Sequence, residues 1–196
     1  MIVDDALPPA QSNEMYQHQF TVTGGTPPYK WNLKMEYPEA SFEGSFPIVT
    51  QENLTPGIAY DMVTKNLDFS FPFYGQSYDS VILHPTGFLM FNSQTYPWPY
   101  YKDLHLLLTC SRSIAPLLGK NFILFPSNDD GIWYEGNNEY AIFRWQITDE
   151  YHEHSSSYNF AVKLYPTGRV EFYYDDMIYT EPVAWIAGIS DATGSV

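Results

Sequence analysis

Alternation of apolar and polar residues with a period of two is the feature that most constrains this chain. It runs from Leu67 to Phe73 and again from Phe160 to Leu164. Successive side chains of a β-strand point to opposite faces, so this spacing gives each segment one apolar face. We expect these side chains to be largely buried, namely Leu67, Phe69, Phe71, Phe160, Val162, Leu164 and Phe172.

A Pro-Thr-Gly triplet occurs twice, each time between two apolar runs. Pro85-Thr86-Gly87 separates residues 81–84 from residues 88–91, and Pro166-Thr167-Gly168 separates residues 160–164 from residues 170–174. Proline presets its own φ and glycine accepts the positive φ that closes a turn, so both triplets predict hairpins. A third hairpin is expected around residues 136–138, and a last strand is expected over residues 185–189.

Many short strands separated by turns predict an all-β fold, an antiparallel β-sandwich of the jelly-roll or Ig-like kind with little helix. The composition agrees, because 15 Pro and 12 Gly oppose long helices and 18% of the residues are aromatic. Residues 103–118 are the one stretch in which the leucine spacing leaves room for a short helix.

The charge of the chain restricts its partners. Nine Lys and Arg residues stand against 23 Asp and Glu residues, which gives a formal net charge of −14. Such a field repels phosphate, so nucleic acids and anionic lipid surfaces are not expected as partners. The sequence has no membrane span, and its single cysteine excludes a disulfide within the chain.

Two stretches resemble modules of bacterial surface proteins. Residues 20–33, which contain Gly24-Gly25-Thr26-Pro27-Pro28, resemble the opening hairpin of Ig-like, cadherin-like modules. Residues 67–192 resemble the β domain found beside secreted proteases and adhesins, and the extracellular domain of plexin-domain-containing proteins. The segments that carry this second resemblance include Phe69-Ser70-Phe71-Pro72-Phe73-Tyr74-Gly75 and Pro85-Thr86-Gly87-Phe88. The combination is most similar to modules of large exported proteins of the Bacteroidetes.

These resemblances imply export, an extracellular or cell-surface location, and a longer parent protein whose neighbouring domains are partners of this one. We expect residues 1–57 to form Ig-like N-terminal strands packed on a β-sandwich module of residues 58–196. The shared motif residues are aromatics, glycines and turn prolines, so no catalytic residue carries over. The expected function is that of a non-catalytic structural or adhesive module, with a carbohydrate-binding module and a hydrolase as alternatives.

The segment from Tyr96 to Tyr101 alternates aromatic residues with proline. Aromatic faces stack on sugar rings, and prolines hold such rings on a stiff backbone. Trp98, Tyr100 and Tyr101 are therefore the candidate ligand-binding residues. The alternative is that these rings pack over the edge of a sheet. The sequence leaves the ligand open, whether a protein or a glycan.

No cofactor is expected, and bound calcium is the alternative. Two acidic pairs at strand ends could supply oxygen ligands, Asp129 with Asp130 and Asp175 with Asp176. Asp at strand ends also serves turns, which is the alternative reading. His152 and His154 have a spacing that zinc can use on a strand, but they lie in a polar stretch that reads as a loop.

Overall fold

The chain divides into two units, Met1–Ala40 and Ser41–Val196, and nearly all of the described residues belong to the second. The computed structural model describes residues 38–55, 61–91, 103–109, 111–119, 122–124, 129–149, 156–178 and 184–192. The hairpin expected over residues 20–33 lies outside these residues, and the expected packing of residues 1–57 stays a prediction.

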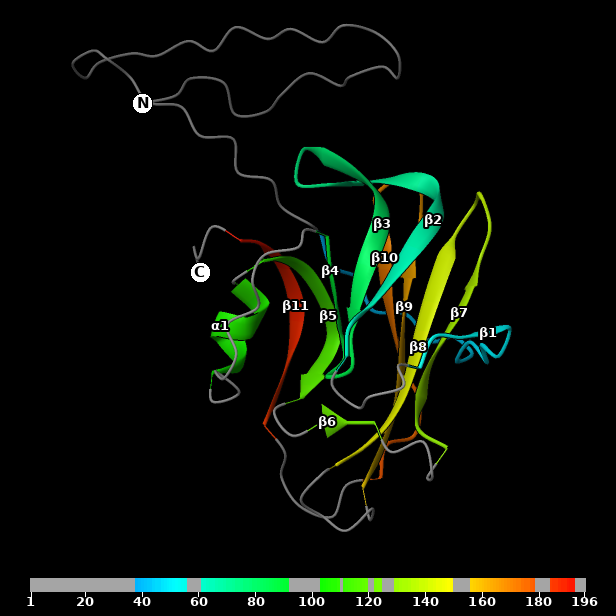
Figure 1. The fold of residues 1–196 in the computed structure, drawn as a ribbon, viewed down its shortest axis with the longest axis vertical. Helices are drawn as coiled ribbons and strands as arrows, with labels where there is room; N and C mark the ends of the chain where they lie inside the picture. Colours follow the sequence, from blue (N-terminus) through cyan, green and yellow to red (C-terminus); the bar gives the residue numbers. More distant parts are fainter. Residues whose placement is uncertain are drawn as a thin grey trace, which may run out of the picture. The chain divides into compact units, whose positions relative to one another are not determined.

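Within the described residues, two antiparallel sheets pack face to face as a sandwich (Figure 1). One sheet has the order β1-β7-β8-β9-β10, with β6 paired to β8, and the other has the order β11-β5-β4-β3-β2. The strands of the first sheet are β1 (Glu52–Asn53), β6 (Phe122–Ile123), β7 (Gly131–Gly136), β8 (Ala141–Asp149), β9 (Ser157–Leu164) and β10 (Val170–Tyr174). Those of the second are β2 (Val63–Phe73), β3 (Gln76–His84), β4 (Phe88–Met90), β5 (Arg112–Gly119) and β11 (Trp185–Asp191).

The predicted all-β sandwich with little helix is confirmed. The three predicted hairpins are present as β3–β4, β7–β8 and β9–β10, and the predicted last strand is β11. A short helix, α1 (Leu104–Thr109), lies in the expected stretch of residues 103–118, and the part of that stretch from Arg112 onward belongs to strand β5. Leu108 of α1 packs on Phe88 and Met90, so the helix covers the second sheet from outside. None of the helices among the described residues is long and apolar enough to cross a membrane.

Two of the residues expected in the core are only half-buried. Leu67, Phe71, Phe160, Val162 and Leu164 are buried as predicted, whereas Phe69 and Phe172 are not fully covered. The pairing of β2 with β3 shifts register between Asn66 and Phe71, so Phe69 lies in the stretch of β2 where the regular pairing with β3 is interrupted. Phe172 lies on β10, the last strand in its sheet order, where fewer neighbours cover a side chain.

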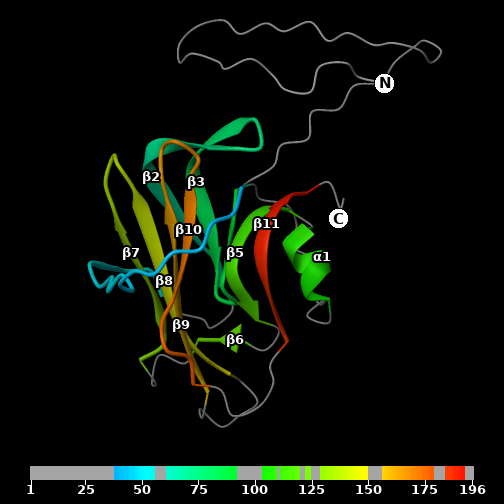
Figure 2. The ribbon, with the colours of Figure 1, turned by 180° about the vertical axis from the view of Figure 1, so that it is seen from behind.

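The segment before β1 crosses the outer face of the first sheet, and we call residues 41–51 the strap (Figure 2). Val49 of the strap is 1% exposed and packs on Ile142 and Ala161. Phe42 meets the ring of Tyr173 edge-on, with the ring centroids 6.4 Å apart. The strap therefore gives part of this sheet a second, smaller core on its outer side.

Candidate functional site

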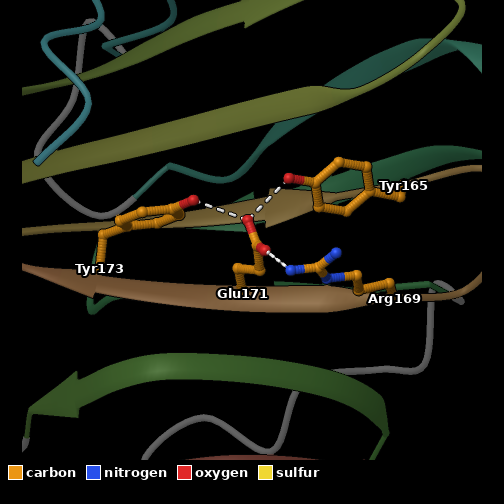
Figure 3. Close-up of polar contacts among 4 residues, drawn as sticks. All are labelled: Tyr165, Arg169, Glu171 and Tyr173. Carbon is orange, nitrogen blue, oxygen red and sulfur yellow. Dashed lines mark hydrogen bonds and ion pairs between the residues drawn. The ribbon is translucent and has the colours of Figure 1, made fainter. Parts of the chain in front are cut away.

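A buried carboxylate lies on the outer face of β10, where the chain has polar and aromatic side chains in close contact (Figure 3). Glu171 is 7% exposed, and its Oε2 accepts hydrogen bonds from the hydroxyls of Tyr165 (2.7 Å) and Tyr173 (2.6 Å). Its other oxygen, Oε1, pairs with the guanidinium of Arg169. Three donors thus hold one carboxylate, and we call these four residues the Glu171 cluster.

The alternation of β10 explains why this carboxylate faces outward. Val170, Phe172 and Tyr174 pair with Leu164, Val162 and Phe160 of β9, whose side chains belong to the core between the sheets. Glu171 and Tyr173 therefore point to the opposite face, and Glu171 lies directly across from Lys163. Tyr165 and Arg169 flank the β9–β10 turn and close over the carboxylate from that side.

The carboxylate and the two phenols of the Glu171 cluster have pKa values far from neutral pH. Burial by itself raises the pKa of Glu171, but the Tyr173 and Tyr165 hydrogen bonds and the charges of Arg169 and Lys163 outweigh it, so the pKa lies below its usual value. Burial and the bond to Glu171 raise the pKa of Tyr165 to about 12 and also raise that of Tyr173. At neutral pH the carboxylate is ionised and both phenols are protonated, so none of the three is poised to exchange a proton.

Cations seated on aromatic rings extend this face across β8 and β9. The Lys163 ammonium lies 4.3 Å from the ring centre of Tyr140 and 4.9 Å from that of Tyr165. The Arg169 guanidinium lies 5.3 Å from the Tyr165 ring as well. Attraction between a cation and a ring face holds both groups in place. The Tyr140 hydroxyl donates a hydrogen bond to Glu135 of β7 at 2.7 Å, so this set of contacts reaches from β10 to β7.

Arg144 of β8 joins the same sheet face to the strap. Its Nε donates to Asn159 at 2.8 Å and its Nη2 donates to Gln146 at 2.7 Å. Its Nη1 donates to the carbonyl oxygen of Val49 at 3.4 Å, and its guanidinium lies 4.8 Å from the ring centre of Trp133. The outer face thus displays tyrosine rings and cations whose positions are already set by neighbouring groups.

The candidate ligand-binding residues Trp98, Tyr100 and Tyr101 lie outside the described residues, and so do His152 and His154. Their role stays a prediction. The Glu171 cluster was not singled out from the sequence, although a signal for it exists. Lys163 and Tyr165 are two residues apart, as are Arg169, Glu171 and Tyr173, and this period places each set on one strand face.

The two acidic pairs occupy strand ends. Asp130 is buried just before β7, and its neighbour Asp129 is exposed with a φ of 60°. Asp175 accepts a hydrogen bond from the Asn159 side chain at 2.7 Å and one from the backbone N–H of Asp176 at 2.9 Å. Within the described residues, no three His, Cys, Asp or Glu side chains gather closely enough to hold a metal ion. Calcium binding by these pairs stays a prediction.

The fold is that of an all-β module built from two packed antiparallel sheets. The model of the NIDO-related family matches residues 36–196, so the chain belongs to the NIDO-related family. No curated protein and no solved structure matches the chain.

Proposed function

We propose that this chain is a non-catalytic structural or adhesive module of a larger secreted or cell-surface protein. Membership of the NIDO-related family supports an extracellular module. The sequence resemblance to modules of exported Bacteroidetes proteins supports a bacterial surface protein as the parent. The contact surface we propose is the outer face of β8, β9 and β10 beside the strap.

One observation carries this proposal, namely that the polar groups of the Glu171 cluster satisfy one another. A general acid or base needs a pKa near the working pH and an open path to its substrate. The Glu171 carboxylate has a lowered pKa and three donors, which favours a rigid surface over acid–base chemistry. Arg169, whose side chain is 63% exposed, and the Tyr140 ring remain at the surface as contact groups.

The cations on the rings favour a protein partner over a glycan at this face. Sugar stacking needs a free ring face, whereas Lys163 lies against the rings of both Tyr140 and Tyr165. Tyrosine and arginine are the residues that most often dominate protein–protein contacts. A carbohydrate-binding role would rest instead on Trp98, Tyr100 and Tyr101.

Adhesion of coated beads tests the proposal. Beads that carry the chain are applied to surfaces coated with purified extracellular-matrix proteins and to a glycan array. We expect retention on protein surfaces, reduced about tenfold or more by Tyr140→Ala with Arg169→Ala. The matched control is Asp79→Ala, which removes an exposed side chain of β3 in the other sheet. Retention on glycans alone, lost in Trp98→Ala, would favour the carbohydrate-binding alternative.

A second arm addresses catalysis. The chain is incubated with glycoside, ester and peptide substrates, and we expect no turnover above that of the Glu171→Gln variant. Turnover that disappears in Glu171→Gln would contradict a non-catalytic role.

A further inference from the structure

The β3–β4 turn is buried between the two sheets, which is unusual for a turn. Pro85, Thr86 and Gly87 are all buried. A Cβ on Gly87 would lie 2.1 Å from the carbonyl oxygen of Leu117 in β5 and 2.8 Å from the ring of Phe160 in β9. The turn therefore fills space between a strand of one sheet and a strand of the other.

His84 makes hydrogen bonds both within this turn and to the other sheet. Its carbonyl oxygen accepts the indole N–H of Trp145, in the other sheet, at 3.1 Å and the backbone N–H of Gly87 at 3.1 Å. The imidazole ring is 1% exposed and stacks on Phe88 with the ring centres 4.8 Å apart. The backbone of Thr86 continues the connection, because its carbonyl oxygen accepts the N–H of Gly119 at the end of β5.

The hydrogen bonds of the imidazole define its protonation state. Nδ1 accepts the backbone N–H of Thr86 at 3.2 Å and lies 2.7 Å from the Thr86 hydroxyl. A ring nitrogen that accepts a hydrogen bond carries no proton, so the hydrogen-bond network assigns the neutral tautomer with its proton on Nε2. A proton added to Nδ1 would face the Thr86 N–H, so this hydrogen bond would be lost, and the Thr86 hydroxyl oxygen would be the acceptor for the new proton.

We propose that His84 and Thr86 form an acid-sensitive latch between the two sheets. Protonation of Nδ1 breaks the bond from the Thr86 N–H, which displaces the buried turn and loosens the bonds to Trp145 and Gly119. The module is then closed at neutral pH and opens in an acidic compartment. Thr86 and Phe88, which contact the imidazole, are uncharged, and so are Trp145 of β8 and Phe160 of β9, which meet the backbone of the turn.

The pH range follows from the burial of the ring. Burial lowers the pKa of His84 from 6.5 to about 3. A group with a lowered folded-state pKa contributes stability that is present above its unfolded pKa and is lost as pH falls toward the folded value. The loss therefore develops from pH 6.5 downward, and at about pH 5 the ratio of closed to open molecules is reduced roughly 30-fold.

Amide hydrogen exchange of the native chain tests the latch, and the second Pro-Thr-Gly turn is the internal control. Exchange is measured at about pH 7.5 and at about pH 5, and each rate is corrected for intrinsic chemical exchange. We expect the protection of the Thr86, Gly87 and Gly119 amides to fall about tenfold or more. The bonded amides of Tyr165 and Gly168, in a turn without histidine, should keep theirs. A parallel fall in both turns would overturn the proposal.

His84→Asn gives an independent arm, because the Asn Oδ1 occupies the place of Nδ1 and accepts a hydrogen bond at every pH. Urea unfolding should show that this variant loses much less stability than the native chain between about pH 7.5 and about pH 5. Glu171→Gln is the matched variant, and it should keep the native pH dependence over that range. A pH dependence in His84→Asn that equals that of the native chain would overturn the latch. If His84→Asn does not fold, the hydrogen-exchange experiment on the native chain decides the question alone.

Discussion

The phenol of Tyr173 donates a hydrogen bond of 2.6 Å to the carboxylate of Glu171, two residues earlier on the same face of β10. A glutamate that is 7% exposed is uncommon in a folded chain and requires such donors. The pair also sits where Phe42 of the strap meets the Tyr173 ring, so it links the sheet to the segment that crosses it.

Removal of this bond should cost stability. Tyr173→Phe leaves the ring and its contact with Phe42 but deletes the hydroxyl, so we expect a loss of about 1.5–3 kcal/mol in the free energy of unfolding. Tyr78→Phe is the comparison, because its hydroxyl also meets an ionised group, Arg112, at 2.8 Å but in the other sheet. Urea denaturation measures both, and a Tyr173→Phe variant as stable as the native chain would show that the bond contributes nothing.

The same carboxylate should make the chain sensitive to strong acid. The pKa of Glu171 is lowered below 4.5, so its contribution is present above 4.5 and is lost as pH falls through the folded-state pKa. Glu171→Gln should flatten the stability profile below about pH 4.5 and leave it unchanged above that value. The effect of His84 acts between pH 6.5 and about 3 and overlaps this range, so the difference between the profiles of Glu171→Gln and the native chain isolates the effect of Glu171.

Ionisation of tyrosine residues should reduce the stability of the chain as pH rises. Burial and nearby acids raise the pKa of Tyr134 to about 12, and burial and Glu171 raise that of Tyr165 to about 12. A raised pKa stabilises the fold below the unfolded value of 10.0, and this contribution is lost as pH rises toward about 12. A phenolate absorbance titration of Glu171→Gln should show earlier ionisation than the native chain, whereas Glu52→Gln should affect Tyr134 instead. Identical curves for all three chains would contradict the assignment.

Three glycines with positive φ should differ in their tolerance of alanine. Gly75 has a φ of +73° and open space around it, so Gly75→Ala should cost about 1–2 kcal/mol for backbone conformation alone. Gly168 has a φ of +85°, and a Cβ there would lie 3.1 Å from the Pro72 carbonyl oxygen, so its variant should cost somewhat more. Gly87→Ala should cost about 4 kcal/mol or more, because its Cβ overlaps backbone atoms of Leu117. Thermal melts that rank the three variants in another order would contradict this account.

Local patterns in the sequence determined the strands and turns of this protein. The period-two runs became β2 and β9, and both Pro-Thr-Gly triplets became hairpin turns with glycine at positive φ. These features depend on the preferences of adjacent residues, so neighbours along the chain are sufficient to predict them.

Tertiary structure alone decided which distant segments cover each turn and each face of a strand. Residues 85–87 are buried between the sheets, whereas the same three residue types at 166–168 stay at the surface. Glu171 is buried because Tyr165 and Tyr173 close over it, and the outer face of β8 and β9 is covered because Val49 reaches Ile142 and Ala161. Such burial depends on contacts between segments far apart in the sequence, and alternation within one strand carries no information about which distant segment will cover it.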